Sequence, residues 1–485
     1  MTTGGGRGAP VRRSHPCPAP RNGARETGAQ GLPALVTWAD GPYGCRVSSH
    51  GSGRFLDLAA LTDDDGALRQ EAHRIAVDVL RPAARSLDQM TPEERISPGS
   101  PFFTAMATLK SLGYHRLFLP PEAGGPDERL SALTQSVVLE ELGWGSLGLA
   151  TAFLVDMLPV MCMSNFGSQE LKDDLMVPWV DDETGSFHGC WAITEPDHGS
   201  DFLSVRDSES SAYGRGQLVA EPVEGGWVLR GQKSAWVSSG PIATHAAVHA
   251  QAGGEGDLVH SLFAVVDLDQ PGVRRGPPAD MMGVRDDPQG EIFFEDVEVP
   301  ERNVLIPPGP LYPAFQDQLL CLTSSVISNV AVGIARAAFE EALHHARTRV
   351  QGGGPLSRHK NIQLTLYGMF ERVETARAYA RATLAHTQAN LPGASAEATG
   401  ASPRHSRAAQ VFAKRTAYEV AHDALQVVGA QGLSRDALVE KLFRDARSLL
   451  IEDGTLEVLS LDAARDLIDN YERTDYDLEE MMATW

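Results

Sequence analysis

Two adjacent carboxylates stand just before a glycine near the C-terminal end of the chain. They are Glu452 and Asp453, in the segment Ile451–Glu457, which reads Ile-Glu-Asp-Gly-Thr-Leu-Glu. A carboxylate acts as a general base when it lies within hydrogen-bond reach of the proton that it removes. At a helix end, such a pair could face a cavity and do this work. Surface Glu-Asp pairs are also common, so the pair alone leaves both interpretations open.

A second segment, Trp191–Asp201, places small and polar residues after a short apolar run. It predicts a strand that ends at Thr194, followed by a tight turn around Gly199 and Ser200. Backbone N–H groups and hydroxyls exposed by such a loop can bind a flat, hydrogen-bonding heterocycle or an anion. An ordinary turn rich in Pro and Gly is the competing interpretation.

Two further segments have the composition of a cofactor site. Gly231–Ser239 contains Trp236 and Ser238, an aromatic ring that can stack and a hydroxyl that can bind a ring edge. Plain strand packing would explain the same residues. Arg347–Lys360 gathers basic side chains around three glycines, which suits either a pyrophosphate-binding loop or a solvated charged loop.

The elements that must hold these segments change character twice along the chain. Residues 55–183 have apolar side chains at helical spacing, and we expect the first helix to end at Pro82. Residues 184–306 contain short β-branched and aromatic runs separated by Gly and Pro, which predict an antiparallel β domain. Helical spacing returns over residues 307–485 and predicts a four-helix bundle. The predicted fold class is α+β and multidomain, with helical domains on either side of the β domain.

Composition excludes several classes of protein. The chain has 485 residues and a formal net charge of -22, which argues for more than one domain and against general nucleic-acid binding. It has no run of about 18 apolar residues, so we expect no membrane span. Five scattered cysteines predict no disulfide framework and no metal site, and they suit a cytoplasmic protein. Residues 1–54 lack the apolar core of a signal peptide and are expected to form a disordered extension.

Taken together, short motifs along the chain resemble those of acyl-CoA dehydrogenases over residues 55–470. A single match would carry little weight, whereas several in the same order and at the same spacing are specific. The motifs are Ile193–Asp201 (Ile-Thr-Glu-Pro-Asp-His-Gly-Ser-Asp), Gly231–Lys233 (Gly-Gln-Lys), Phe294–Pro300 (Phe-Glu-Asp-Val-Glu-Val-Pro), Ala331–Gly333 (Ala-Val-Gly), Leu425–Gly429 (Leu-Gln-Val-Val-Gly), Arg444–Ala446 (Arg-Asp-Ala) and Asp453–Thr455 (Asp-Gly-Thr).

The resemblance implies that FAD binds between the β domain and the C-terminal bundle. It also implies a homotetramer, built as a dimer of dimers, or a homodimer. Gly199 and Ser200 match the mouth of the site, where the substrate thioester and its carrier bind. The residues that match the border of the isoalloxazine ring are Trp191, Ile193, Thr194, Trp236 and Ser238.

Other matched positions concern the rest of the cofactor. Arg349 matches the family arginine that meets the FAD pyrophosphate, commonly from a neighbouring subunit. Gln426 and Gly429 match a loop that contacts the FAD of a partner subunit. Thr455 and Glu457 match positions near the nucleotide end.

The implied reaction is α,β-desaturation of an acyl thioester, in which a carboxylate removes the α-proton and the β-hydrogen passes to flavin as hydride. The family base is usually a Glu, and Asp453 stands in its place, with Glu452 where an aromatic residue is usual. Asp453 as base is the preferred reading, but Glu452 could move in, or the base could be lost. Ser324 also replaces an arginine that is often found at its position.

Three functional hypotheses follow from the resemblance. The first is a dehydrogenase acting on an unusual acyl thioester, with CoA slightly preferred to an acyl-carrier protein, and with an electron-transfer flavoprotein as the expected acceptor. The second is a flavin-dependent monooxygenase on the same fold. The third is a non-catalytic paralogue, in which the fold serves binding or assembly.

Overall fold

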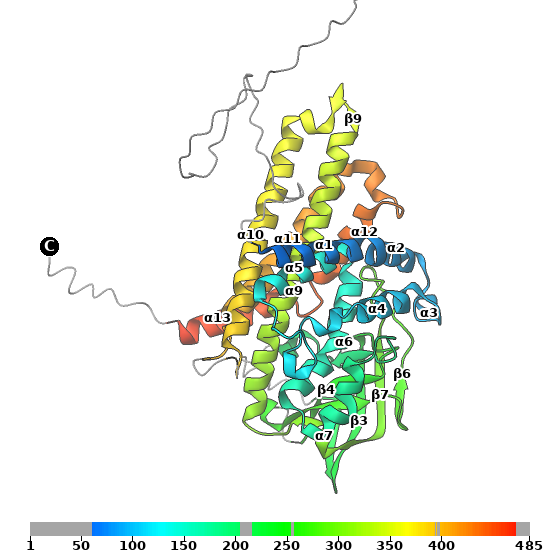
Figure 1. Ribbon diagram of the computed structural model, residues 1–485, viewed down its shortest axis with the longest axis vertical. Helices are drawn as coiled ribbons and strands as arrows, with labels where there is room; N and C mark the ends of the chain where they lie inside the picture. Colours follow the sequence, from blue (N-terminus) through cyan, green and yellow to red (C-terminus); the bar gives the residue numbers. More distant parts are fainter. Residues whose placement is uncertain (1–60, 204–215, 254–256, 393, 395–397, 472–485) are drawn as a thin grey trace, which may run out of the picture. The chain divides into compact units, whose positions relative to one another are not determined.

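The computed structural model describes residues 61–203, 216–253, 257–392, 394 and 398–471. The chain divides into two units, Met1–Ala60 and Leu61–Trp485, and all described residues lie in the second. The predicted extension, residues 1–54, therefore lies outside the described residues. Along the second unit, helices come first, strands follow and helices return, in the predicted order (Figure 1). The domain limits at residues 183/184 and 306/307 remain predictions.

Polar caps start the helices of the first helical region. Thr62 accepts a hydrogen bond from Asp65 N, and the Asp65 side chain accepts one from Thr62 N, so two otherwise unpaired N–H groups at the start of α1 are satisfied. Ser146 caps α6, whose side chains are mostly buried, as the apolar sequence of this stretch predicts. The helices are α1 (Asp63–Ile75), α2 (Arg81–Gln89), α3 (Pro92–Arg95), α4 (Pro101–Ser111), α5 (Ala132–Gly145), α6 (Leu147–Phe166), α7 (Gln169–Leu171) and α8 (Val177–Val180).

The prediction that Pro82 ends the first helix is wrong. The chain passes from α1 through a π-helical turn, Ala76–Leu80, directly into α2, and Pro82 lies in the first turn of α2. A proline inside an α-helix clashes with the carbonyl of the preceding turn. The wider π turn comes just before Pro82, so the local geometry changes where that clash would arise.

The middle region forms one sheet with the strand order β6-β7-β3-β2-β4-β5-β8, and β1 lies beside β4. Its buried side chains include a cluster of Val, Leu, Ala and Phe from the central strands. The strands are β1 (Gly189–Ala192), β2 (Val219–Val223), β3 (Gly226–Ser238), β4 (His245–Gln251), β5 (Ser261–Asp267), β6 (Val273–Arg275), β7 (Gln289–Pro300) and β8 (Val304–Ile306).

The sheet is mixed, which corrects the prediction of an antiparallel β domain. β1 runs parallel to β4, and β2 makes one parallel pairing with β4, while the other pairs are antiparallel. Parallel neighbours need a long connection, and β2 and β3 lie between β1 and β4 in the sequence. Turn signals identify hairpins between consecutive strands only, so the sequence pattern could not reveal this pairing.

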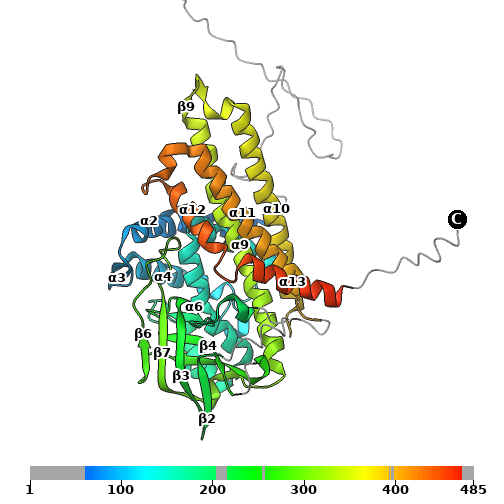
Figure 2. The same ribbon diagram turned by 180° about the vertical axis from the view of Figure 1, so that it is seen from behind.

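Long helices return after β8 and run side by side (Figures 1 and 2). The sheet lies at one end of α9, and the short hairpin of β9 (Val350–Gln351) and β10 (Gly354–Pro355) lies at the other end (Figure 1). α12 and α13 pack against α11. The helices are α9 (Leu311–Thr348), α10 (Lys360–Asn390), α11 (Pro403–Val428), α12 (Leu438–Leu449) and α13 (Leu456–Asn470).

Small residues and buried ion pairs join the first helical region to the last. A Cβ atom at Gly333 of α9 would lie 2.2 Å from the carbonyl oxygen of Glu140, so only glycine permits this approach of α9 to α5. Arg336 of α9 and Arg377 of α10 both bind the buried Glu140, at 2.6 and 2.9 Å. The pKa of Glu140 is accordingly far below its usual value. Three helices from distant parts of the sequence are therefore held together.

Two described helices, α6 and α9, are long and apolar enough to cross a membrane. Most of each apolar window is buried inside the protein, 72% for α6 and 78% for α9. Core helices of globular proteins share this property, so length and composition alone carry little weight here.

Candidate active site

The ends of two neighbouring strands form one wall of a large cavity, here called the strand wall. β1 is followed by Ile193 and Thr194, and β3 ends with Trp236 and Ser238, and all four residues line the cavity. An irregularity between Lys233 and Val237, the stretch that contains Trp236, interrupts the pairing of β3 with β7, and bulges of this kind redirect side chains. Trp236 is 60% exposed, so its ring is available for stacking.

Hydrogen bonds tie the two strand ends together. Ser234 N donates to Thr194 O at 3.0 Å, and the hydroxyls of the two residues are 2.6 Å apart. The buried Lys233 donates to Ile193 O at 3.1 Å and forms an ion pair of 2.7 Å with the buried Glu195. Both charges therefore have a partner, which holds the strand wall in one arrangement.

A buried chain of polar groups orients Trp191. Its Nε1 is 2.9 Å from His249 Nε2, and His249 Nδ1 is 2.5 Å from the hydroxyl of Tyr312. An indole N–H can only donate, so Nε2 accepts and the hydrogen of the neutral imidazole sits on Nδ1. Burial lowers the pKa of His249 well below its usual value, which keeps the ring neutral in this tautomer.

The opposite wall, here called the helix wall, comes from α9, α11 and the turn between α12 and α13. This turn contains Glu452, which is half-buried, and Asp453, whose side chain is exposed because it faces the open space of the cavity. Asp453 has a φ of 53° and Gly454 a φ of 90°. A left-handed backbone is unfavourable for a residue with a side chain, and such residues concentrate at functional sites.

Side chains from α11 hold this turn. Gln410 Nε2 donates to Asp453 O at 3.0 Å. Lys414 donates to Gly454 O at 3.0 Å and also to Glu452 O. Both α11 side chains are buried. Three successive carbonyl groups of the turn therefore have partners on one helix.

The two walls meet at the loop that follows β1. Thr455 N donates to Ser200 Oγ at 3.0 Å, and Gly199 N donates to the Asp201 carboxylate at 2.6 Å. Thr455 also caps α13, because its hydroxyl accepts from Val458 N. The predicted mouth of the site thus lies directly against the turn that carries Asp453.

The carboxyl groups of the helix wall, and Asp287 beside them, hold their protons more tightly than usual. Burial raises the pKa of Glu452 to about 8, and the nearby Asp287 and Asp453 add to the effect. Burial likewise raises the pKa of Asp287 to about 7. The surrounding protein also removes solvent from Asp453 and thereby raises the pKa of its carboxyl group. The Lys414 ammonium opposes this rise. The pKa of Lys414 is lowered to about 8 by burial.

The cavity between the walls has a volume of about 650 Å³, which is within the usual range for small-molecule sites. It brings together residues that the sequence placed in a single site, although their segments lie far apart in the chain. The predicted residues that line it are Trp191, Ile193, Thr194, Gly199, Ser200, Trp236, Ser238, Glu452 and Asp453.

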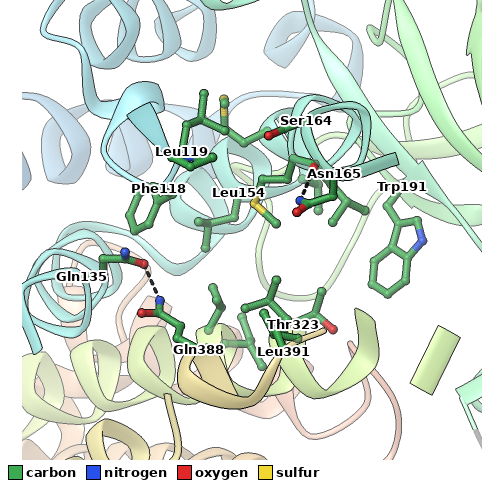
Figure 3. Close-up of a pocket in the computed structure, with 18 of the residues that line it drawn as sticks. Phe118, Leu119, Gln135, Leu154, Ser164, Asn165, Trp191, Thr323, Gln388 and Leu391 are labelled. Carbon is green, nitrogen blue, oxygen red and sulfur yellow. Dashed lines mark hydrogen bonds between the residues drawn. The ribbon is translucent and has the colours of Figure 1, made fainter. Parts of the chain in front are cut away.

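A second cavity of about 270 Å³ opens beside the first, between α6, α9 and the end of α10 (Figure 3). Phe118, Leu119, Leu154 and Leu391 give it apolar walls. Trp191 and Thr323 lie toward one side in Figure 3, and a hydrogen-bonded pair of glutamines lies toward the other. The residues shared by the two cavities are Thr151, Val155, Trp191, Thr323 and Asp453.

Besides Thr455, whose backbone N–H donates to Ser200 Oγ, four predicted residues do not line the large cavity. Arg349 is exposed at the end of α9, beside the β9–β10 hairpin. Gln426 is exposed near the end of α11, and Gly429 follows that helix with a φ of 71°. Glu457 is exposed in the first turn of α13. Their predicted contacts with FAD, which involve a partner subunit for the first three, remain predictions.

Sequence reasoning missed the polar face of α11. Arg407, Gln410 and Lys414 are buried and spaced three and four residues apart, so they lie on one side of the helix. Arg407 donates to Ser324 Oγ at 3.0 Å and pairs with Asp462 at 3.2 Å. Its guanidinium thus reaches Ser324, the position where the resemblance led us to expect an arginine. The spacing was visible in the sequence, but the partners were not.

The residues present suit a flavin. The strand wall offers the indole of Trp236 and the hydroxyls of Thr194 and Ser238 to a flat, hydrogen-bonding ring. The helix wall contributes Gln410, whose buried Oε1 has no hydrogen-bond partner among the described residues. Buried polar atoms are normally paired, so this oxygen is suited to a ligand or a water molecule in the cavity.

Comparisons with known proteins agree with this arrangement. The chain matches the N-terminal, middle and C-terminal domains of acyl-CoA dehydrogenase over residues 62–183, 190–297 and 322–468. Benzylmalonyl-CoA dehydrogenase of Aromatoleum aromaticum is 30% identical over 410 residues, which cover 84% of this chain and 98% of that protein.

Solved structures share the fold. Butyryl-CoA dehydrogenase from Megasphaera elsdenii superposes with a TM-score of 0.73 at 24% identity, over 84% of this chain and 99% of that one. PigA, solved with FAD and proline, gives a TM-score of 0.70 at 23% identity, over 85% of this chain and 99% of that one.

The fold and the site together define an FAD-dependent oxidoreductase. More specifically, the chain belongs to the acyl-CoA dehydrogenase family.

Proposed function

We propose that this protein catalyses the α,β-desaturation of an acyl thioester and that Asp453 is the base. The position of Asp453 carries the proposal, because its side chain lies where the two cavities meet. A thioester held there would place its α-carbon beside a carboxylate, with its acyl chain in the small cavity. The left-handed backbone of the residue supports this role, since such strain is typical of catalytic positions.

Glu452 is the less suitable base. It lines only the large cavity, and its pKa of about 8 keeps it protonated at neutral pH. Burial raises the pKa of Asp453 as well, but there the Lys414 ammonium opposes the rise and favours the ionised form that a base needs. Two neighbouring carboxyls with different surroundings can thus hold different protonation states.

Bound FAD supplies the acceptor for the two electrons and the hydrogen that leave the β-carbon. The strand wall would hold its ring, with Trp236 stacked on it and the hydroxyls of Thr194 and Ser238 at its edge. Trp191 borders both cavities, and the His249–Tyr312 chain keeps its ring in place.

The apolar lining of the small cavity suits the acyl chain. We prefer CoA to an acyl-carrier protein as the thioester carrier, because the net charge of -22 gives no help in docking an acidic protein. We also propose that two or four copies assemble, so that Arg349, Gln426 and Gly429 reach a neighbour's FAD. An electron-transfer flavoprotein is the proposed acceptor, and the cytoplasm the proposed location.

The test is an anaerobic titration of the purified holoenzyme with saturated acyl-CoAs, from butyryl to dodecanoyl, while the flavin absorbance is recorded. We expect one or more of them to bleach the flavin. Asp453→Asn should slow this reduction by about 10³-fold while FAD stays bound, because the α-proton has no acceptor. Glu452→Gln, which imitates the protonated side chain, should keep the rate within about tenfold.

The other outcomes separate the alternatives. A yellow protein that none of these acyl-CoAs bleaches would reject ordinary saturated acyl-CoAs as substrates, and other acyl-CoAs, acyl-carrier-protein thioesters and oxygen consumption would then be measured. A folded protein without flavin would contradict the assignment to catalysis and favour a binding or assembly role. Equal loss in both variants would contradict the choice of Asp453 over Glu452.

A further inference from the structure

The turn that presents Asp453 does not hold its shape by itself. Asp453 and Gly454 have φ values of 53° and 90° in succession, and only the second is a glycine. A left-handed conformation is unfavourable for a residue with a Cβ atom, so the surroundings must maintain it. The turn connects α12 to α13 and is itself neither helix nor strand.

Two side chains of α11 maintain it. Gln410 binds the carbonyl of Asp453 at 3.0 Å, and Lys414 binds the carbonyls on either side, at Glu452 and, at 3.0 Å, at Gly454. The two side chains are four residues apart on one helix, so they lie one above the other and face the same way. A rigid helix thus holds three successive peptide groups of the catalytic turn.

The charge of Lys414 is unusual for a buried group. Its side chain is 0% exposed, and the carboxyls that act on it, Asp453 and Glu452, belong to the turn that it binds. Its two hydrogen-bond partners are neutral carbonyls. Burying an unpaired ammonium is costly, and a neutral side chain could also fill this space, so the charge calls for an explanation.

We propose that Lys414 is a positioning residue for the base: it fixes the Asp453 turn at the junction of the two cavities and favours the ionised form of the Asp453 carboxyl. Gln410 shares the first task but carries no charge, so it cannot perform the second. This proposal rests on the proposed function for its catalytic meaning. The electrostatic effect of Lys414 on Asp453 does not depend on that function.

Several charged groups surround Asp453 and must be considered together. Lys414 approaches from α11, and its ammonium lowers the pKa of Asp453. Glu452 is its neighbour in the turn, and Asp287 lies close to Glu452. Arg407 of α11 and Arg447 of α12 line the same cavity, and Arg407 is engaged with carboxylates of its own. The charged group that acts on the pKa of Asp453 is Lys414. Lys414 is therefore the cation whose removal should change the ionisation of Asp453.

The experiment compares Lys414→Met, Lys414→Arg and Gln410→Met as holoenzymes. The rate of flavin reduction by a saturated acyl-CoA is measured in single turnovers across the pH range. In the plot of this rate against pH, Lys414→Met should shift the acid limb, where the rate falls at low pH, to higher pH by about one unit or more. The reason is that the cation that favours the carboxylate is lost. Its limiting rate should also fall by about 10- to 100-fold, because the turn is no longer held.

The two other variants separate position from charge. Lys414→Arg keeps the positive charge, so its acid limb should lie at the same pH as that of the wild type. Gln410→Met should lower the limiting rate without moving that limb. A Lys414→Met enzyme with an unchanged pH profile would overturn the charge role, and one with an unchanged limiting rate would overturn the positioning role. If Lys414→Met does not fold, Lys414→Gln takes its place in the same comparison.

A second measurement does not require turnover. Infrared spectra of the holoprotein follow the protonated carboxyl band with pH, and subtraction of Asp453→Asn isolates Asp453. Its midpoint should rise in Lys414→Met and stay unchanged in Gln410→Met. An unchanged midpoint in Lys414→Met would reject the inference even if acyl-CoA reduces the flavin. A wild-type protein that no thioester reduces would instead reject the proposed function and leave this titration decisive for Lys414.

Discussion

Two buried lysines, one in each wall of the large cavity, have opposite surroundings. Lys233 in the strand wall is paired with Glu195 at 2.7 Å and also binds a backbone carbonyl. Lys414 in the helix wall binds only carbonyls, those of the turn that contains Asp453. Both side chains are 0% exposed. The first has a counter-charge and joins two strands, whereas the charge of the second acts on Asp453, the carboxyl that we propose as the base.

The contrast extends to the rest of each wall. In the strand wall, hydroxyls, backbone groups and the ion pair satisfy one another and form a fixed surface for a ring. In the helix wall, Glu452 has a raised pKa and Asp453 has a strained backbone, and the pKa of the neighbouring Asp287 is raised too. Perturbed ionisation and strain concentrate where chemistry occurs. The strand wall is thus suited to binding, and the helix wall to proton transfer.

The largest effect on stability is expected from breaking the paired lysine. Lys233→Met leaves Glu195 charged and without its partner inside the protein, which should cost about 3–5 kcal/mol of unfolding free energy. Denaturant unfolding of the holoprotein measures it. The double variant Lys233→Met with Glu195→Gln should recover much of the loss. Equal losses in the single and double variants would show that the pair is not what stabilises this wall.

A smaller effect is expected from Glu452, and its sign depends on pH. The folded-state pKa of about 8 lies above the ordinary value of 4.5, so the native state binds the proton more tightly than the unfolded chain. Stability from this group is complete below pH 4.5 and is lost as the pH rises toward 8. Glu452→Gln should therefore gain about 2 kcal/mol over the wild type at pH 8, a figure reduced because the side chain is half-buried.

Melting curves of the wild type and Glu452→Gln at several pH values test this expectation. The two proteins should have similar stability near pH 4.5 and diverge above it. Glu457→Gln is a matched control, because that carboxylate is exposed on α13 and should give no such divergence. A constant difference between Glu452→Gln and wild type at all pH values would contradict the raised pKa.

The smallest effect is expected from the stacking ring of the strand wall. Trp236→Ala should weaken FAD binding by about tenfold or less, since aromatic pairs contribute about 0.5–1.5 kcal/mol beyond the area that they bury. Trp236→Phe should recover most of the affinity. Fluorescence titration of apoprotein with FAD measures both. If Trp236→Ala binds FAD with unchanged affinity, the flavin ring does not stack on Trp236 and binds elsewhere in the cavity.

The strand wall was predictable because its residues belong to short, continuous motifs. Trp191–Ser200 and Trp236–Ser238 lie at strand ends, and each motif carries its own turn and hydroxyl signals. The order of helices, strands and helices also followed from apolar spacing. Local patterns failed for the parallel pairing of β1 with β4, whose segments are distant in the sequence. They also failed at the π turn before Pro82, because proline was expected to end the helix.

The sequence by itself determined the family, the strand-wall residues and the presence of two carboxyls before Gly454. Only the tertiary structure decided which of the two faces both cavities, and which helix holds their turn. Lys414 lies about 40 residues before Asp453 in the sequence, and its role depends on how α11 packs against the α12–α13 turn. Ionisation and strain at a site arise from such long-range neighbours, which residue types and local spacing do not specify.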